Sequence, residues 1–244
     1  RFHFLAEGSE HVIFTYTVSP PIVNLNEKFV IAIDGGAASG KSTLAKALAN
    51  RLNVLYIDTG SMYRAFALYF LEKNIEVTKE NVLKNIDKID IKLVSENSVT
   101  KVYLNGVDVS DKIRENIVSI TTPKISIYKP VREYMLNKQR QYALNSSVVM
   151  DGRDIGTVVF PNANLKIYLI ASYEQRAIRR QNDLKKIGRY EDIETLKEEL
   201  KKRDIEDMTR EISPLKKADD AVEIDTTGNT LEETLNIVMN IINE

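Results

Sequence analysis

The chain has 244 residues, of which 43% are hydrophobic and 28% are charged, values typical of a globular protein with one buried core and insertions. Its formal net charge of −1 excludes the broad basic surface of a nucleic-acid-binding protein, and the absence of cysteine excludes disulfides, thiolate metal sites and cysteine nucleophiles. No apolar run reaches the roughly 20 residues that span a bilayer, so we expect no membrane partner and a cytoplasmic location.

The first 27 residues differ in character from the rest of the chain. They begin without methionine and lack the basic, apolar and small-residue order of a signal peptide. We therefore expect residues 1–27 to be an N-terminal extension, either added sequence or the tail of an upstream domain, and residues 28–244 to be the functional domain. Both histidines of the chain, His3 and His11, lie in this extension, so no catalytic histidine is expected in the domain.

A glycine-rich turn follows the first predicted strand. The apolar run 29–35 leads into "GGAASGKST" and then into a predicted helix, in which Leu44 and Leu48 recur at helical spacing. The turn matches the P-loop pattern, whose backbone N–H groups and helix N-terminus bind phosphates. In this pattern Lys41 reaches the β- and γ-phosphates of a nucleotide, and Ser42 ligates Mg²⁺. The predicted nucleotide-binding residues are Gly35, Gly36, Ala37, Ala38, Ser39, Gly40, Lys41, Ser42 and Thr43.

The remaining predicted elements describe an α/β domain with one interruption. Strand 54–58 and a helix capped near Ser61 continue the alternation of strand and helix, which favours a parallel sheet flanked by helices. Residues 75–114 break this rhythm with short β-prone runs on both sides of Asn105-Gly106, which predicts a small antiparallel insertion. The alternation then resumes with a helix from Pro130, strands 148–151 and 165–171, a charged helical region 172–215, strand 221–225 and a last amphipathic helix over 231–242.

A P-loop occurs both in nucleotide switches and in enzymes that transfer phosphoryl groups. A GTPase switch needs an Asp-x-x-Gly loop and, after it, an Asn-Lys-x-Asp guanine clamp. The candidate loop, Asp225 to Gly228, lies near the C-terminus and no clamp follows it. The sequence therefore argues against a GTPase.

Two further segments place polar residues where ligands of open α/β sheets bind. "DTGSMYR" (58–64) and "DGRDIGT" (151–157) each follow a predicted strand, so both lie at the carboxyl edge of the sheet. The glycines of the second segment favour backbone held close to a ligand. The alternative is a tight turn with a local pair between Arg153 and Asp154.

A charged segment near the C-terminus, "RDIEDMTREISPL" (203–215), holds three more candidates. Arg203, Asp207 and Arg210 recur at spacings that bring them to one face of a helix. The alternative is a solvent-exposed helix with a weak Arg203–Asp207 pair.

Taken together, these segments resemble the bacterial cytidylate kinases, the CMP/dCMP kinases. The resemblance covers about residues 28–244 and includes the P-loop, "DTGSMYR", "PVREYMLNKQR", "DGRDIGTVVFPNANLKIYLIAS", "RDIEDMTREISPL" and "DDAVEIDTT". It implies a P-loop NTPase-type three-layer α/β fold, with an antiparallel nucleoside-monophosphate-binding insertion at about 75–114 and a helical lid at about 176–215. It also implies transfer of the γ-phosphoryl group of ATP to CMP or dCMP, with Mg²⁺ as cofactor, by a monomer that binds no nucleic acid.

The resemblance assigns roles to individual positions of this sequence. Lys41, Arg153, Arg203 and Arg210 are expected to act on the transferring phosphoryl group. Arg132 and Asp154 are expected to recognise cytosine, because an arginine can donate to the ring carbonyl and a carboxylate can accept from the exocyclic amine. The residues implied to bind the monophosphate substrate are Thr59, Tyr63, Arg64, Arg132, Arg153, Asp154, Arg203, Asp207 and Arg210.

Some points stay open at the level of the sequence. Pro123 stands where family members often have a serine near the base, so CMP versus dCMP preference and tolerance of UMP are undecided. The contribution of three arginines at the start of the lid, Arg176, Arg179 and Arg180, is also open. The alternative functions are a P-loop kinase for another small acceptor, such as UMP, shikimate or dephospho-coenzyme A, and a nucleotide-binding switch without turnover.

Overall fold

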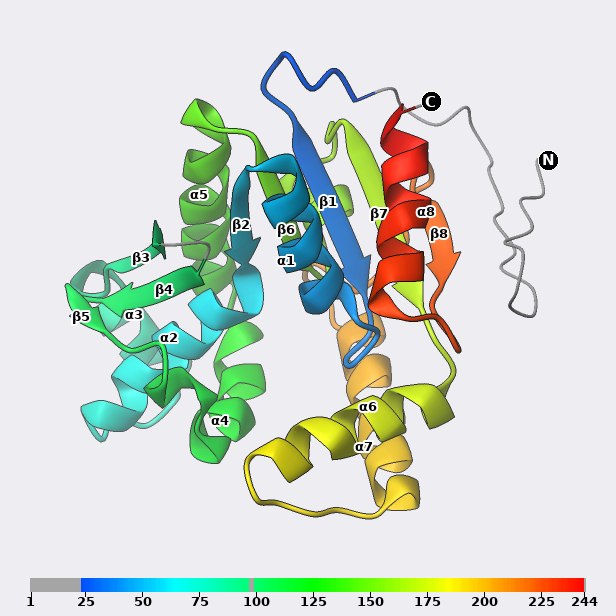
Figure 1. Ribbon diagram of the computed structural model, residues 1–244. Helices are drawn as coiled ribbons and strands as arrows, with labels where there is room; N and C mark the ends of the chain where they lie inside the picture. Colours follow the sequence, from blue (N-terminus) through cyan, green and yellow to red (C-terminus); the bar gives the residue numbers. More distant parts are fainter. Residues whose placement is uncertain (1–22, 97–98, 244) are drawn as a thin grey trace.

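The computed structural model describes residues 23–96 and 99–243 (Figure 1). The expectations for residues 1–22 lie outside this part of the chain. Val23, which precedes the predicted domain boundary, is buried in the same apolar cluster as Phe29. The boundary at residue 28 stays a prediction.

Five parallel strands form the central sheet. In chain order they are β1 (Val30–Gly35), β2 (Leu55–Asp58), β6 (Val148–Gly152), β7 (Leu165–Ile170) and β8 (Val222–Asp225). Their order in space is β2-β6-β1-β7-β8, and all four neighbouring pairs are parallel. The chain leaves β1 first toward one edge of the sheet and later toward the other. A crevice at the carboxyl end of β1 is where such a sheet binds its ligands.

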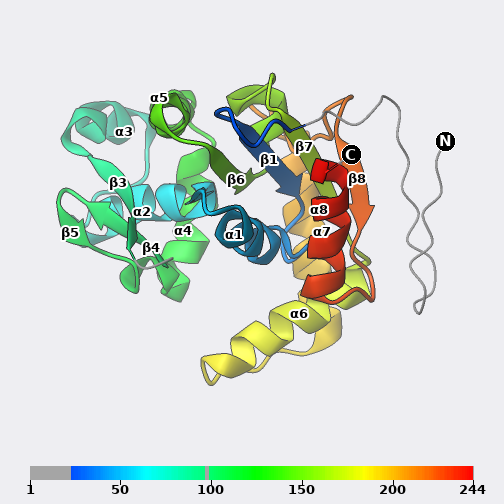
Figure 2. The ribbon, with the colours of Figure 1, turned by 45° about the horizontal axis from the view of Figure 1, so that its top comes forward.

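Helices cover both faces of this sheet. On β1, Ile31 and Ile33 belong to one apolar cluster and Ala32 to the other, as the two-residue period of a strand requires. The cluster around Ile31 includes α1 (Lys41–Leu52) and α8 (Leu231–Asn243), and the cluster around Ala32 includes α2 (Thr59–Glu72) and α5 (Lys129–Asn145). The predicted three-layer α/β fold is confirmed (Figures 1 and 2).

The start of α2 differs from the prediction. The helix begins at Thr59, two residues before Ser61, because the Asp58 side chain accepts a hydrogen bond from the Ser61 backbone N–H at 3.0 Å. Asp58 is therefore the N-cap. This shift brings Thr59 onto the first turn of the helix, at the carboxyl edge of the sheet.

A small antiparallel sheet interrupts the parallel one, as predicted. Its order is β3-β4-β5, and at the β4–β5 turn Asn105 and Gly106 have φ of 49° and 82°, as a two-residue hairpin requires. Tyr134 and Tyr142 of α5 hold β3 to the core, because their hydroxyls accept from the Ile91 and Leu93 backbone N–H groups at 3.3 and 2.6 Å. The elements of this region are α3 (Lys79–Asn85), η1 (Ile86–Lys88), β3 (Ile91–Glu96), β4 (Val99–Leu104), β5 (Val107–Asp108), η2 (Lys112–Arg114) and α4 (Asn116–Ser126).

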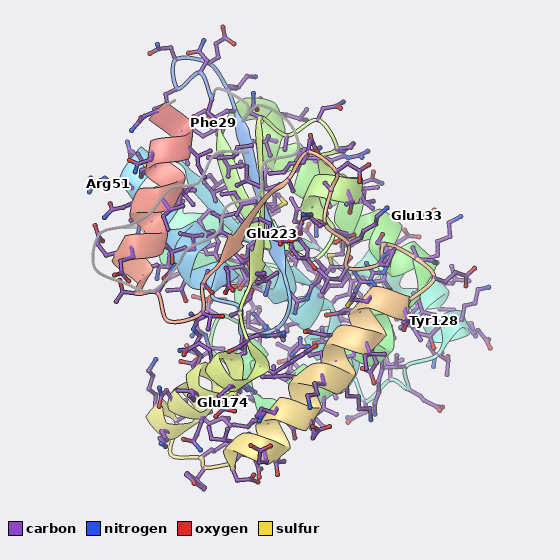
Figure 3. The ribbon with its side chains drawn as sticks, turned by 90° about the vertical axis from the view of Figure 1, so that its right-hand side faces the viewer. Phe29, Arg51, Tyr128, Glu133, Glu174 and Glu223 are labelled. Atoms are coloured by element: carbon purple, nitrogen blue, oxygen red, sulfur yellow. The ribbon has the colours of Figure 1, made fainter. Side chains whose placement is uncertain are left out.

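Two helices project beyond the carboxyl edge of the sheet. We call α6 (Tyr173–Lys186) and α7 (Ile193–Thr209) the lid hairpin. It lies at the opposite end of the molecule from Phe29, which precedes β1 (Figure 3, where Glu174 marks α6). Within residues 23–96 and 99–243, no helix combines the length and apolar character of a bilayer-spanning segment.

Candidate functional site

The P-loop connects the carboxyl end of β1 to the first turn of α1. Gly40 forms the N-cap of α1. Its φ of 94° is a backbone conformation that residues with a side chain rarely adopt. Lys41 is only 7% exposed, and its Nζ donates to the Gly36 carbonyl at 3.0 Å. The lysine is thus folded back over the loop and contacts its backbone.

A pocket of about 410 Å³ opens beside the P-loop. Residues 38–44 form one wall, and Arg179, Thr226 and Asn229 contribute to the others. Arg179 donates to the Ser39 carbonyl at 3.1 Å and to the Thr226 carbonyl at 2.6 Å, so it links α6 to the P-loop and to the segment after β8. Sequence reasoning missed Thr226, whose only signal was its place directly after a strand.

A buried carboxylate faces the start of α1. Asp151 accepts from the Ser42 hydroxyl at 2.6 Å and from the Tyr56 hydroxyl at 2.9 Å. Burial, with the negative charge of Asp58 second, raises the pKa of Asp151. Sequence reasoning missed this residue, although it ends β6, the strand beside the P-loop strand.

Ser42 and Asp151 together fit a magnesium ion. Mg²⁺ prefers oxygen ligands and is usually held by one or two carboxylates, with phosphates and water completing its shell. A hydroxyl and a carboxylate in direct contact beside a phosphate loop provide that kind of donor set. In the part of the chain that the structure describes, no group of three or more His, Cys, Asp or Glu residues is placed to hold a metal ion.

The charge of Lys41 is poorly compensated. Desolvation is the main reason why the pKa of Lys41 falls to about 7, and the charge of Arg153 lowers it further, while Asp151 opposes the shift. A buried cation of this kind gains from an anionic ligand, because the ligand supplies a nearby opposite charge in place of the lost hydration.

The segment after β6 is held by a second buried carboxylate. Asp34 of β1 accepts from the backbone N–H groups of Ile155 and Gly156 at 2.9 and 2.8 Å. These two residues begin η3 (Ile155–Val159), one turn of π-helix. Burial raises the pKa of Asp34 to about 7 despite these two bonds. Asp34, which sequence reasoning also missed, thus fixes the backbone that carries Arg153 and Asp154.

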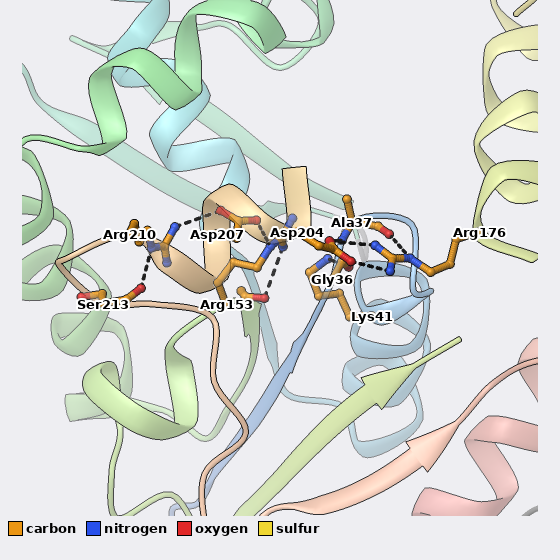
Figure 4. Close-up of polar contacts among 10 residues, drawn as sticks. Gly36, Ala37, Lys41, Arg153, Arg176, Asp204, Asp207, Arg210 and Ser213 are labelled. Atoms are coloured by element: carbon orange, nitrogen blue, oxygen red, sulfur yellow. Dashed lines mark hydrogen bonds and ion pairs between the residues drawn. The ribbon is translucent and has the colours of Figure 1, made fainter. Parts of the chain in front are cut away.

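Two local ion pairs were alternatives from the sequence, Arg153–Asp154 and Arg203–Asp207, and neither is formed. Arg153 donates to Asp207 at 2.8 Å, and Arg210 donates to the other carboxylate oxygen of Asp207 at 3.1 Å and to the Ser213 carbonyl at 2.6 Å (Figure 4). Burial alone would raise the pKa of Asp207, but Arg153 and the other arginines together lower it. Asp207 therefore joins α7 to the segment after β6.

Arg203 stands apart from this network. Within the described residues it makes no hydrogen bond or ion pair. Its side chain is exposed, yet desolvation by the surrounding protein, followed by the charge of Arg153, lowers its pKa to about 10. Arg203 stays charged at neutral pH, and the charges of Arg153, Arg64 and Arg180 disfavour that charge, whereas Asp207 favours it.

Arg132 and Asp154 lie side by side and are largely buried. Their side chains are 6% and 13% exposed, and Arg132 Nη1 lies 3.7 Å from Asp154 Oδ2. The guanidinium also lies 5.6 Å from the centre of the Tyr63 ring. A donor, an acceptor and an aromatic ring are therefore adjacent, which is the chemistry that recognises a nucleobase. Pro123 is exposed within α4, and the neighbouring Thr122 hydroxyl donates to the Val118 carbonyl.

Thr59 and Arg64 lie on the first turns of α2. Thr59 is 4% exposed and donates to the Asp151 carbonyl at 2.7 Å. Arg64 Nη2 contacts Asp58 at 3.3 Å and Ser61 at 3.2 Å. The structure thus places Arg64 at the carboxyl edge of the sheet, with one carboxylate beside it, and its role as a phosphate ligand stays a prediction.

Buried polar atoms without partners mark the same places. Among the described residues there are four, namely Ser39 Oγ, Arg64 Nε, Arg132 Nε and Thr157 Oγ1. Buried polar groups in folded proteins are almost always hydrogen-bonded, so each such atom needs an explanation. Three of them belong to residues that the sequence assigns to phosphate or base binding.

The chain is similar to known proteins over most of its length. Residues 31–244 match the cytidylate kinase family. A cytidylate kinase of Fusobacterium nucleatum is 49% identical over 87% of this chain and 96% of its own length. A cytidylate kinase of Bacillus licheniformis is 47% identical over 90% of this chain and 98% of its own length.

Two other matches are less complete. A bifunctional pantoate ligase/cytidylate kinase of Prochlorococcus marinus is 47% identical over 88% of this chain, which spans 43% of that protein. A solved structure of an uncharacterized protein from Eubacterium ventriosum shares the fold at 14% identity, with a TM-score of 0.50 over 89% of this chain and 99% of that one. The sequence matches are the decisive ones, and by them this chain belongs to the cytidylate kinase family.

Proposed function

We propose that this protein transfers the γ-phosphoryl group of ATP to CMP or dCMP, giving ADP and CDP or dCDP. One observation supports this most directly: the positive charges of Lys41, Arg153 and Arg203 disfavour one another, and among the described residues only Arg153 of the three has an ion-pair partner, which leaves the group short of negative charge. Two polyanions that must be brought together would supply that charge, and neutralising their repulsion is the main task of a phosphoryl-transfer site.

The reaction needs no general base from the protein. The second pKa of a phosphate monoester is about 6, so the attacking oxygen of CMP is largely ionised at neutral pH. Positioning and charge neutralisation then make up the catalysis. This agrees with a site built from arginines, one lysine and carboxylates that hold them.

Individual residues have defined tasks in this proposal. The P-loop binds the phosphates of ATP, and Ser42 and Asp151 would hold Mg²⁺, which neutralises phosphate charge when bound. Arg64 binds the phosphate of CMP, and Arg132 and Asp154 recognise cytosine. Arg153, Arg203 and Arg210 surround the group in transfer, and Asp207, which orients two of these arginines, would also contact the ribose.

The test is an ADP-release assay with Mg-ATP and one acceptor at a time. CMP, dCMP, UMP, AMP and GMP are presented separately at equal concentration. We expect rapid release with CMP and dCMP alone. Release that does not depend on any monophosphate, or that follows shikimate or dephospho-coenzyme A instead, would refute the proposal.

The base pocket leads to a prediction about selectivity. We expect Asp154→Asn to lower kcat/KM for CMP by about 100-fold, because a charged hydrogen bond to the exocyclic amine is lost. UMP has a carbonyl in place of that amine, so kcat/KM for UMP should fall little. The ratio of kcat/KM for CMP to that for UMP should therefore decrease. Asp87→Asn, at an exposed position of η1, is the control and should leave both values unchanged. An unaltered CMP/UMP ratio in the Asp154 variant would remove this residue from base recognition.

The lowered pKa of Lys41 leads to a prediction about proton uptake on ATP binding. With a pKa of about 7, Lys41 is mostly neutral at pH 8 in the free protein, and bound phosphates should return its pKa toward the ordinary value of about 10.4. The ATP-bound protein then holds more protons than the free protein, so ATP binding should take up close to one proton at pH 8. For the same reason, the affinity for ATP should fall as the pH rises above 7. Calorimetry in buffers of different ionisation enthalpy measures the uptake. The same experiment on Lys41→Met should show none.

A further inference from the structure

The base of the lid hairpin is fixed to the P-loop by a buried ion pair. Arg176 of α6 donates to both carboxylate oxygens of Asp204 in α7, at 2.5 and 2.8 Å. The two side chains are 6% and 7% exposed. This bidentate geometry is the strongest that an arginine and a carboxylate adopt, and neither residue contacts the groups assigned to the transferring phosphoryl.

The same pair encloses one peptide of the P-loop. Arg176 Nε donates to the Ala37 carbonyl at 2.7 Å, and the Ala37 N–H donates to Asp204 Oδ1 at 3.3 Å (Figure 4). A side chain at the preceding position would not fit, because a Cβ on Gly36 would lie 2.7 Å from Arg176 Nη2 and 2.9 Å from Asp204 Oδ1. We call the Arg176–Asp204 pair and its two hydrogen bonds to the Ala37 peptide the clamp. The clamp is a reason for glycine at position 36, in addition to the close approach of phosphates that a P-loop requires.

Apolar contacts extend the attachment. Ala37 belongs to the hydrophobic cluster of the lid hairpin, together with Ala177, Leu184, Leu196 and Leu200. The core of the hairpin thus ends on the P-loop itself. On the other side of the pair, the Arg176 guanidinium lies 4.8 Å from the centre of the Tyr173 ring.

The clamp also determines where a catalytic arginine starts. Arg203 directly precedes Asp204 in α7, so anchoring Asp204 to Ala37 fixes the backbone from which Arg203 projects. Arg176, whose contribution was open from the sequence, has its guanidinium occupied by Asp204 and the Ala37 carbonyl. Its charge is matched by a carboxylate, in contrast to Arg203.

We propose that Arg176 and Asp204 are positioning residues that hold the P-loop in its phosphate-binding shape and join it to the lid hairpin. The inference rests on the proposed function only in identifying the P-loop ligand as ATP. Without the clamp, the Ala37 peptide loses both partners and the loop no longer presents its N–H groups in one arrangement. ATP binding should weaken, whereas CMP binding should change little.

The main experiment removes both charges together. Replacing one partner alone leaves an unpaired buried charge and risks unfolding, so the variant is Arg176→Met with Asp204→Leu. ATP dissociation constants are measured by calorimetry without acceptor, and CMP dissociation constants are measured separately. We expect the dissociation constant for ATP to rise about 10- to 30-fold, because the Ala37 peptide loses two hydrogen bonds. The dissociation constant for CMP should change less than about threefold.

Two further variants keep the result decisive. Lys197→Met removes another ion pair between α7 and α6, Lys197–Glu174 at 3.0 Å, without touching the P-loop, and should leave ATP binding unchanged. Arg176→Lys keeps the charge but cannot contact Asp204 and the Ala37 carbonyl together, so it should weaken ATP binding even if the double variant does not fold.

The outcomes separate this inference from the proposed function. Wild-type affinity for ATP in the folded double variant, or in Arg176→Lys, would overturn the inference, as would an equal loss in Lys197→Met. A wild-type protein that binds ATP but phosphorylates no monophosphate would refute the proposed function alone, since the clamp is judged by binding.

Discussion

Replacing Lys41 with methionine is expected to lower kcat by about 10²- to 10³-fold, the usual effect of removing one preorganised charge from a transfer site. The lysine follows the P-loop glycines directly, and its Nζ contacts the Gly36 carbonyl at 3.0 Å. Methionine has a similar length and no charge, so it tests the charge with little change in packing. Steady-state kinetics with CMP as acceptor measures the effect.

The same variant should be at least as stable as the wild type. The folded-state pKa of Lys41 lies below its ordinary value, so the folded protein binds fewer protons than the unfolded chain between about pH 7 and 10.5. Wild-type stability therefore rises with pH across this window, and the penalty for a charged Lys41 is complete only below it. The advantage of methionine should be largest below pH 7 and disappear toward pH 10.5.

Lys46→Met is the matched control for this prediction. Lys46 is exposed on α1, a little more than one turn after Lys41, and should affect neither turnover nor stability. Thermal unfolding between pH 6 and 9 gives the second readout. A Lys41 variant that retained a tenth of the wild-type kcat would contradict the assigned role, and one that melted far below the wild type would show that the lysine supports the fold.

Replacing Arg203 with alanine is expected to lower kcat by about 100- to 1000-fold and to leave the ATP dissociation constant within about threefold. Arg203 has no hydrogen-bond or ion-pair partner in residues 23–96 and 99–243, so alanine leaves no protein group unpaired. Its charge disfavours those of Arg153 and Lys41, and we propose that the group in transfer lies between these three cations. An interaction made only in the transition state affects kcat more than binding.

The control for Arg203 is its neighbour. Lys202 is exposed on α7, and Lys202→Ala should leave kcat unchanged. Because both side chains leave the same helix, a shared loss would point to α7 itself and not to the guanidinium. Equal losses of turnover and of ATP affinity in Arg203→Ala would place this arginine on bound ATP, contrary to the proposal.

Local sequence patterns were sufficient for much of the fold. The P-loop, the βα alternation and the Asn105-Gly106 hairpin each depend on neighbours in the chain, and the structure contains all three. The N-cap of α2 was misplaced because Asp58 and Ser61 can both cap a helix. In the folded chain Asp58 ends β2 and its side chain accepts from the Ser61 N–H, so the helix starts directly after the strand.

The candidate site was predicted less completely than the fold. Arg153, Asp207 and Arg210 were expected to bind phosphate or ribose, but the structure shows that they also bind one another. Asp34, Asp151 and Asp204 were not identified, although each is a buried carboxylate that holds a site segment in place. A carboxylate of this kind carries no motif, since its partners lie up to 167 residues away in the chain.

The sequence by itself determined the class of the protein: a P-loop α/β domain of the cytidylate kinase type, with its charged residues in the right order. Those features depend on periodicity, turn chemistry and motif spacing, which are local. Only the tertiary structure decided which arginines are neutralised and which remain available. Arg176 and Arg203 look alike in the sequence, but folding surrounds the first with Asp204 and the Ala37 carbonyl and leaves the second without an ion-pair partner among the described residues. Burial and distance set the energy of a charge, and both are created when distant segments pack together.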